Sequence, residues 1–212
     1  MRAVTLEDVE VAVKAMSDTA LENEAYFCEL DGVVGDADFG TSLANGFRAI
    51  EERWDTFDRT SIGSFFLGIS QTITSTVGGC SGPIWGTAFM RAGIVARDKD
   101  TLEANDIVEI FEKAIDGIKA RGGAEEGDKT LLDALAPMAR AFEASHQDDP
   151  LTACLQAAEK AVEDTKHLEA RRGRQSFTGE RSIGTLDPGT VAVAMMTKRV
   201  ATHWHDRSGA AA

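Results

Sequence analysis

Helical spacing of apolar residues is the pattern that most constrains what this chain can form. Apolar side chains recur at helical intervals, as at Leu43, Phe47 and Ile50, and they rarely alternate with polar ones. Alanine, leucine, glutamate and lysine dominate most windows, and the chain has only four prolines, a mixture that favours helices over sheet. We therefore expect an all-α protein with no convincing strand.

Glycines, prolines and capping residues divide the chain into about eight expected helices. The first begins at Thr5, where Asp8 follows three residues later in a near capping box, and continues in a second stretch to about Leu30. The others are expected at 41–54, from 61 to the glycine pair 78–79, and at 84–95, 104–120, 129–144, 150–170 and 190–205. Antiparallel helices with short connections predict a bundle, closed into a barrel because eight helices exceed a four-helix core.

We expect a single domain over residues 1–212. The length suffices for one buried core, and no linker, repeat or shift in composition divides the chain. The arginine-rich stretch 171–189 is expected to be a long irregular connection. Connections of this length in a compact domain are usually functional or disordered, so this segment is a candidate part of a site.

The formal net charge of −13 limits the classes of partner. Nucleic acids and anionic membranes require a basic surface, and both are therefore excluded. Cys28, Cys80 and Cys154 are odd in number and far apart, which indicates neither a disulfide framework nor a zinc site. No apolar run approaches the roughly 18 residues of a membrane span, and the N-terminus lacks a signal-peptide pattern, so we expect a soluble cytoplasmic protein.

Three aspartates mark a candidate metal site between the first two expected helices. Asp31, Asp36 and Asp38 are interrupted by glycines in the sequence DGVVGDADFG, and carboxylate oxygens are the ligands of hard divalent ions, Mg²⁺ above all. An EF-hand calcium loop is rejected, because counting from Asp36 places Gly40 fifth and Phe47 twelfth. The alternative is that Asp36 or Asp38 only caps the next helix, although one cap does not require three acids.

Two glycine-rich connections are candidate phosphate-binding segments. At 78–83 the sequence GGCSGP precedes an expected helix, whose first N–H groups suit a phosphate; a plain helix connection is the alternative. At 122–130 the sequence GGAEEGDKT nearly spells a P-loop, but Asp128 precedes Lys129 and the segment follows a helix rather than a strand. We therefore interpret the second segment as a turn and the start of a helix.

Four arginines lie within eleven positions, at Arg171, Arg172, Arg174 and Arg181. Arginine is the side chain best shaped to hold a phosphate with two parallel hydrogen bonds, whereas a solvated basic loop is the alternative. The histidines show no ligand spacing with any acid or cysteine, and no role is assigned to them.

These motifs, in this order, resemble the DhaL family, the nucleotide-binding L subunit of dihydroxyacetone kinases. The resemblance covers nearly the whole chain and is carried by LD at 30–31, GDADFG at 35–40, GGCSGP at 78–83, GDKT at 127–130, GR at 173–174, GERSIG at 179–184 and DPG at 187–189. It implies an eight-helix antiparallel barrel that holds ADP or ATP at one end. It also implies that two Mg²⁺ ions bridge the nucleotide phosphates to Asp31, Asp36 and Asp38.

The resemblance further implies which residues surround the nucleotide. No residue of this chain is expected to be catalytic beyond positioning the metal ions and phosphates. Gly122 and Leu131 fall where the family encloses the base. The expected nucleotide contacts are Phe39, Thr41, Ser42, Gly79, Cys80, Ser81, Gly122, Leu131, Arg174, Arg181, Asp187, Pro188 and Gly189.

As a member of this family, the chain is expected to transfer the γ-phosphoryl group of ATP to dihydroxyacetone or a related ketose. In the family the ketose is bound covalently by a histidine of a partner K subunit, so the resemblance implies activity only with such a partner. Two phosphoryl donors stay open: ATP that exchanges freely, or a captive ADP that a phosphocarrier of the sugar phosphotransferase system rephosphorylates. A homodimer is also expected.

Two positions depart from the family pattern. Phe39 and Ser42 stand where the family usually has histidine and asparagine. Phe39 removes a polar group and Ser42 shortens the side chain, so we expect nucleotide binding to persist while the preference for ketose or donor is open to change. The alternative function is a non-catalytic, ADP-loaded module that regulates a partner protein.

Overall fold

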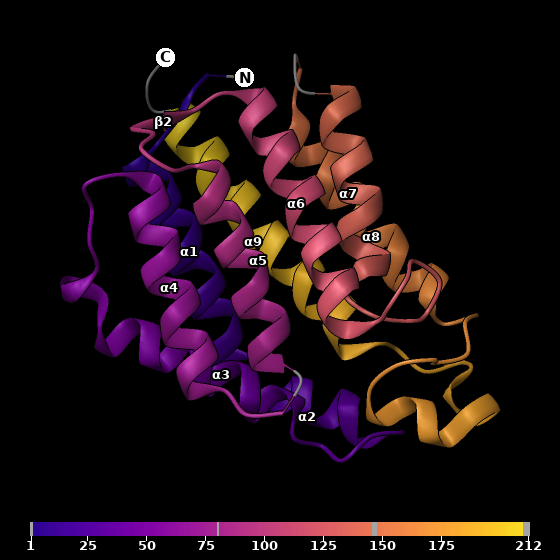
Figure 1. Ribbon diagram of the computed structural model, residues 1–212. Coiled ribbons are helices and arrows are strands. Elements are labelled where there is room, and N and C mark those ends of the chain that lie inside the picture. Colours follow the sequence, from indigo (N-terminus) through magenta and orange to yellow (C-terminus); the bar gives the residue numbers. More distant parts are fainter. Residues whose placement is uncertain (1, 80, 146–147, 210–212) are drawn as a thin grey trace.

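The computed structural model describes residues 2–79, 81–145 and 148–209 of the chain. Within these ranges the predicted all-α fold is confirmed, and most consecutive helices run in opposite directions (Figure 1). None of the described helices is long and apolar enough to cross a bilayer. The helices of the described ranges are α1 (Leu6–Glu22), α2 (Glu24–Gly32), α3 (Phe39–Glu52), α4 (Ile62–Thr76), α5 (Ser81–Val95), α6 (Ala104–Gly122), α7 (Leu132–Ser145), α8 (Pro150–Thr165) and α9 (Pro188–Gly209).

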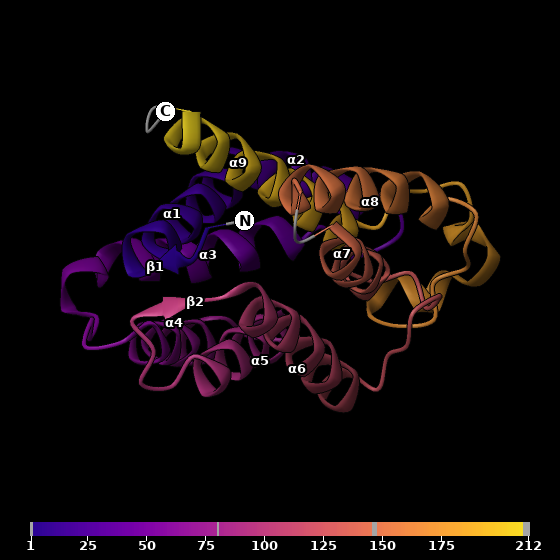
Figure 2. The same ribbon diagram turned by 90° about the horizontal axis from the view of Figure 1, so that it is seen from above.

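Eight of these helices close into a ring. From α3 to α9 each helix packs against the next, α9 packs against α1, and α1 packs against α3. Viewed from above, the helices surround a common centre (Figure 2). The remaining helix, α2, packs against α3 and α9. The expected eight-helix barrel is therefore confirmed, with α2 as an additional helix.

The first expected helix is divided into α1 and α2 at Asn23. This residue has φ −111° and ψ 17°, outside the helical range, and its side-chain amide donates to the carbonyl of Thr19 at 2.8 Å. Asparagine side chains compete for helix backbone groups in this way and favour helix ends. The break gives α2 its own direction, so Asp31 in its last turn lies at the start of α3.

The predicted capping box begins α1. Thr5 Oγ1 accepts the N–H of Asp8 at 3.3 Å, and the Asp8 carboxylate accepts the N–H of Thr5 at 3.0 Å. We expect Thr5→Ala to lower the free energy of unfolding by about 1 kcal/mol, because it removes an acceptor from the first helical turn. Urea denaturation measures the change. Thr5→Ser retains the hydroxyl and is the control, so an equal loss in both variants would contradict the capping role.

Several element boundaries differ from the prediction. Two short strands, β1 (Val4–Thr5) and β2 (Thr101–Leu102), form an antiparallel pair where no strand was expected; two residues are too few to show alternation. The helix expected from 129 begins instead at Leu132, because Lys129 has a left-handed backbone with φ 62°. The helix expected to reach 170 ends at Thr165.

The arginine-rich connection contains regular structure, contrary to the expectation of an irregular loop. Residues Arg174–Ser182 form 3₁₀ turns, η2, which are interrupted at Gly179, where φ is 56° and ψ −133°. Elsewhere, a short 3₁₀ segment, η1 (Trp54–Thr56), follows α3. After α8, the N–H groups of Lys166, His167 and Leu168 bond to carbonyls three residues back, at 3.3, 3.1 and 3.2 Å. Such tightened bonds end an α-helix, which explains why α8 stops before the predicted position.

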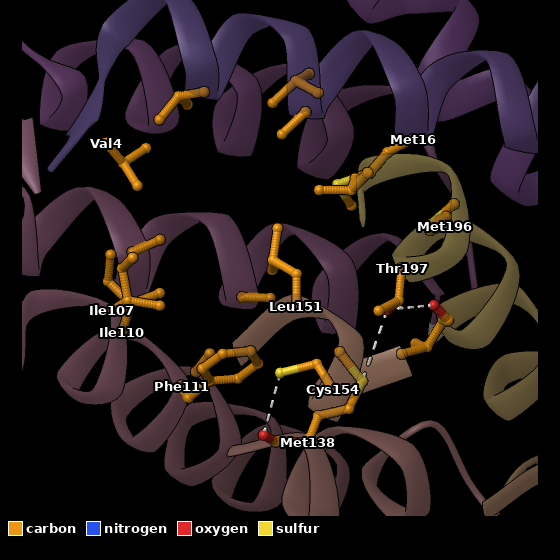
Figure 3. A pocket seen from close by; sticks show the side chains of 18 of the residues that line it. Val4, Met16, Ile107, Ile110, Phe111, Met138, Leu151, Cys154, Met196 and Thr197 are labelled. Carbon is orange, nitrogen blue, oxygen red and sulfur yellow. Dashed lines mark hydrogen bonds between the residues drawn. The ribbon is translucent and has the colours of Figure 1, made fainter. Parts of the chain in front are cut away.

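An apolar cavity of about 360 Å³ lies inside the barrel, lined by side chains of α1 and of α4 to α9. Figure 3 shows this cavity from close by. Phe111, Met138 and Cys154 are part of its wall, and burial raises the pKa of the Cys154 thiol to about 12. Trp85 and Leu131 line this cavity and also a second one at the end of the barrel. The second cavity adjoins the three aspartates.

Candidate metal centre and the adjoining cavity

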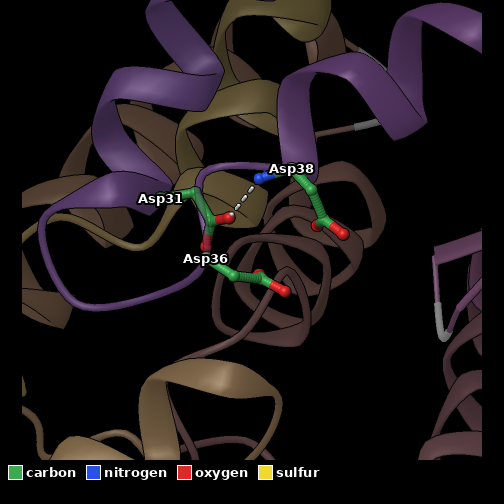
Figure 4. A group of neighbouring side chains, drawn as sticks. All are labelled: Asp31, Asp36 and Asp38. Atoms are coloured by element: carbon green, nitrogen blue, oxygen red, sulfur yellow. Dashed lines mark hydrogen bonds between the residues drawn. The ribbon is translucent and has the colours of Figure 1, made fainter.

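The three aspartates predicted as metal ligands converge between α2 and α3 (Figure 4). Asp31 belongs to the last turn of α2 and is 5% exposed, whereas Asp36 and Asp38 are exposed. Asp38 directly precedes α3. One oxygen from each carboxylate lies within 4.8 Å of the others. The helix ends thus bring together three anionic oxygen ligands that the sequence separates by up to seven positions.

The backbone of this loop allows the close approach. Ala37 has φ 60°, a left-handed conformation that L residues rarely adopt. A Cβ at Gly35 would lie 2.2 Å from Asp31 Oδ1, so only glycine fits beside this carboxylate. Asp31 Oδ2 accepts the N–H groups of Asp38 at 3.0 Å and Phe39 at 3.3 Å. These bonds join the end of α2 to the start of α3.

The capping interpretation is wrong for Asp38. Although Asp38 occupies the N-cap position of α3, its side chain makes no capping hydrogen bond. Asp36 instead forms an ion pair with Arg174, whose Nε lies 3.2 Å from its carboxylate. Neither side chain is therefore engaged at the helix end, and both carboxylates face the same region as Asp31.

The electrostatics of the cluster favour a cation. Burial raises the pKa of Asp31; the N–H groups of Phe39 and Asp38 act against this, and the negative charges of Asp36 and Asp38 add to it. A divalent cation would offset the repulsion among the three carboxylates, and Mg²⁺ prefers such hard oxygen ligands. The donor set therefore fits the metal that the sequence predicts.

A cavity of about 190 Å³ begins at these aspartates. It lies between the start of α5, the end of α6, the loop before α7 and the segment that leads into α9. The structure brings eleven of the predicted site residues to its wall. They are Asp31, Asp36, Asp38, Phe39, Ser81, Gly122, Leu131, Arg174, Asp187, Pro188 and Gly189.

Other predicted residues are absent from the described wall. Thr41 and Ser42 lie in the first turns of α3, Gly79 is exposed with φ 64°, and Arg181 is exposed near the end of η2. Cys80 lies outside the described residues. Of the arginine run, Arg172 and Arg174 line the cavity, whereas Arg171 and Arg181 do not.

Several wall residues were missed by the sequence-based reasoning. Ile84, Trp85 and Ile118 occupy helices at core spacing and carried no separate signal. Lys129 and Thr130 belong to the GDKT motif that was interpreted as a turn. That turn is present, but it also forms part of the wall. The missed residues are Ile84, Trp85, Ile118, Ala124, Lys129, Thr130 and Gln175.

Phe39, which departs from the family pattern, has an evident packing role. Its ring meets the fully buried Phe27 of α2 edge-on, with 6.2 Å between ring centroids. Such contacts contribute about 0.5–1.5 kcal/mol beyond burial. The phenyl group therefore stabilises the α2–α3 junction that holds the aspartates, while it also lines the cavity.

Asp187 fixes the opposite wall, where α9 begins. Its Oδ2 accepts the N–H of Thr190 at 2.7 Å and the hydroxyl of Thr190 at 2.9 Å. Burial raises the pKa of Asp187 to about 6, with a further contribution from Asp133, although the Thr190 bonds and Lys129 act against it. A Cβ at Gly189 would lie 3.1 Å from Asp187 Oδ2 and 3.3 Å from the Leu131 nitrogen, which explains a glycine at this close contact.

We expect Asp187→Asn to change how stability depends on pH. Between the ordinary pKa of 3.8 and about 6, the folded protein retains a proton at Asp187 that the unfolded chain has released. The associated stability is complete below about pH 4 and is lost as the pH rises through 6, a total of about 3 kcal/mol. Asparagine stays neutral, so the variant should gain this amount relative to wild type between pH 4 and 7. Denaturant titrations at both pH values test this, and a constant difference would contradict it.

Comparison with known proteins supports a family assignment. The model of the DAK2 domain matches residues 33–202. The ADP-binding subunit DhaL of the PEP-dependent dihydroxyacetone kinase from Escherichia coli is 35% identical, over 83% of this chain and 86% of its own length. The L-erythrulose 1-kinase of Mycolicibacterium smegmatis is 33% identical over 92% of this chain, which covers 35% of that enzyme.

A solved structure shares the fold. The dihydroxyacetone kinase from C. freundii in complex with AMP-PNP and Mg²⁺ matches with a TM-score of 0.74 and 27% identity, over 92% of this chain. This chain spans about a third of that enzyme, 34% of its length. Because the domain model spans most of the barrel and the DhaL subunits match over most of both chains, this chain belongs to the DAK2 domain family, with the DhaL subunits of dihydroxyacetone kinases.

Proposed function

We propose that the chain is the Mg·nucleotide-binding subunit of a dihydroxyacetone kinase or related ketose kinase. In this role it presents the γ-phosphoryl group of ATP to a sugar hydroxyl held by a partner K subunit. The observation that carries the proposal is the convergence of three carboxylates at the edge of a cavity that also has an apolar part. A nucleotide combines a polyphosphate, which requires cations in this acidic chain, with an apolar base.

Each part of the cavity suits one part of a nucleotide. Asp31, Asp36 and Asp38 would hold the metal ions, two of them according to the resemblance. Ile84 and Leu131 are apolar and suit the faces of a base, excluding water from it. A Cβ at Gly122 would lie 3.0 Å from Ile84 Cδ1, so glycine keeps this slot open.

The phosphate end has further donors. Ser81 begins α5 and lines the cavity, and the N–H groups of a helix start attract phosphate. Arg174 contributes a guanidinium beside Asp36. Bound Mg²⁺ supplies the positive charge that offsets the phosphate oxygens during phosphoryl transfer. This chain's residues would hold and orient the reactants rather than exchange protons or form bonds with them.

The relatives' names support a two-component enzyme. The E. coli subunit is named as the ADP-binding part of a PEP-dependent kinase, while the erythrulose kinase of M. smegmatis is a longer chain that contains a segment like this one. We therefore propose that the ketose is bound by a separate K-type partner. The homodimer implied by the resemblance is part of the same proposal. The phosphoryl donor is either ATP or a phosphocarrier, and the turnover measurement described next distinguishes the two.

Two measurements test the proposal. Calorimetry of the chain with ADP should show binding that requires Mg²⁺; absence of binding with the metal present would overturn the proposal. The chain mixed with a K-type partner, dihydroxyacetone and ATP should then form the phosphorylated ketose. Sustained turnover indicates exchange of nucleotide, and one turnover indicates captive ADP. Nucleotide binding without any sugar phosphate would favour the regulatory alternative.

A further inference from the structure

Lys129 is a buried cation beside the candidate site. It is 1% exposed and has a left-handed backbone with φ 62°. Its Nζ donates to three backbone carbonyls, those of Leu168 at 3.2 Å, Ser182 at 2.6 Å and Thr185 at 2.8 Å. An ammonium group has three N–H donors and no acceptor, so these carbonyls satisfy it completely.

All three carbonyls belong to the segment 166–187, which connects α8 to α9 and is called the strap below. Leu168 follows the end of α8, Ser182 is the last residue of η2, and Thr185 precedes α9. Carbonyls at the C-terminal ends of helices carry partial negative charge and attract cations, and that of Ser182 lies at such an end. Lys129 therefore joins both ends of the strap to the loop before α7.

The strap supplies one wall of the cavity. Arg172, Gly173, Arg174, Gln175 and Asp187 line it, and Arg174 is the group that pairs with Asp36 at 3.2 Å. This guanidinium is largely exposed, at 68% of its side chain, so its position depends on the backbone that carries it.

Polar contacts hold much of the strap. Two of its large apolar side chains, Phe177 and Ile183, are 85% and 49% exposed, whereas Leu186 packs partly buried against the core. Within the strap, the N–H of Gly184 donates to the Lys166 carbonyl at 2.7 Å, and the N–H of Ala170 donates to Ser182 Oγ at 2.8 Å. Segments with few buried apolar contacts open easily. The order of this wall therefore depends on a small number of polar groups, with Lys129 at their centre.

We propose that Lys129 is a positioning residue for nucleotide binding, because it holds the strap so that Arg174 faces the aspartates. Its ammonium acts through the three carbonyls and not by contact with phosphate, unlike the lysine of a P-loop. This inference rests on the proposed nucleotide site. The GDKT segment, which the sequence predicts to be only a turn, thus contributes a residue that positions the site.

The test compares Mg·ADP affinity in four chains by calorimetry: wild type, Lys129→Met, Arg174→Ala and the double variant. Lys129→Met removes the ammonium donor of all three carbonyls, although that of Ser182 keeps the bonds from the hydroxyl and N–H of Thr185, and we expect roughly a tenfold loss of affinity. In the Arg174→Ala background the same change should cost less than about twofold, since residues that act through one another are not additive. Equal losses in both backgrounds would overturn the positioning role and indicate a general structural one.

Two further variants keep the test decisive. Lys160→Met removes the same charge from an exposed site on α8, where Nζ pairs with Asp164, and should leave affinity unchanged. Ser182→Ala removes the hydroxyl that accepts from Ala170 and donates to Gly179, without altering Lys129. It should reproduce the loss and its dependence on Arg174, even if Lys129→Met does not fold.

Hydrogen exchange provides a readout that does not depend on the ligand. In Lys129→Met and in Ser182→Ala, the amides of Ala170 and Gly184 should exchange faster than in wild type. The exchange rates of amides in the ring helices should be unchanged. If wild type does not bind Mg·ADP, the proposed function fails and this inference with it. If wild type binds and Lys129→Met and Ser182→Ala bind equally well, only the role of Lys129 is overturned.

Discussion

Asp38→Asn should weaken Mg·ADP binding by at least about 100-fold. The substitution removes one of three negative charges that lie within 4.8 Å of one another, and an amide oxygen is a poorer ligand for a hard cation. Even changes to the partners of metal ligands commonly cost 10–100-fold in metal affinity, so the loss of a ligand's charge should cost more. Calorimetry with ADP and Mg²⁺ measures the effect.

The fold should not change in this variant. Asp38 is exposed and makes no side-chain cap to α3, so its replacement leaves no buried group unpaired. Helical content and the denaturation midpoint should therefore match wild type. Asp55→Asn, the same change at an exposed position outside the cavity, is the control. Unchanged nucleotide affinity in Asp38→Asn would remove the metal centre from the proposal, whatever the control shows.

The helices were largely predictable because local signals and packing agree. The Thr5–Asp8 capping box marks the start of α1, and Pro150 marks the first turn of α8. Ring closure follows from repeated apolar faces that have no other surface to cover. The errors in helix boundaries occur where a single residue has a non-helical backbone conformation. Asn23 divides one expected helix into two, and the left-handed Lys129 makes another helix begin later than predicted.

The part of the candidate site that consists of side-chain metal ligands was predictable from the sequence. Carboxylates with small residues between them indicate a cation, and the three aspartates do converge. The strap was not predictable in this way, because its carbonyls belong to the backbone and have no residue signature. Gln175 and Lys129 reach the wall through that backbone arrangement. The sequence therefore indicates which chemistry the site can support, whereas the backbone that surrounds these side chains is seen only in the structure.

Gly40→Ala should damage both stability and binding, because it affects the contact between the two helices that carry the aspartates. A Cβ at Gly40 would lie 2.1 Å from the Glu24 carbonyl oxygen and 2.7 Å from the Cys28 nitrogen, both in the backbone of α2. Backbone atoms inside a helix cannot rotate away as a side chain can, so α2 and α3 must separate. Overpacking of this kind costs about 1–3 kcal/mol, more than the roughly 1 kcal/mol that alanine gains in a helix.

The same displacement should reduce metal binding, because Asp31 lies on α2 and Asp38 at the start of α3, joined by the bond from the Asp38 N–H. We expect a lower denaturation midpoint and a loss of Mg·ADP affinity of about tenfold or more, measured where the variant is still folded. Glu52→Ala, a change to alanine at an exposed position in the last turn of the same helix, is the control. If Gly40→Ala lost stability but bound Mg·ADP normally, the spacing of the two helices would not govern the site. Loss of both together is expected only if the junction that stabilises this end of the barrel also sets the geometry of the metal ligands.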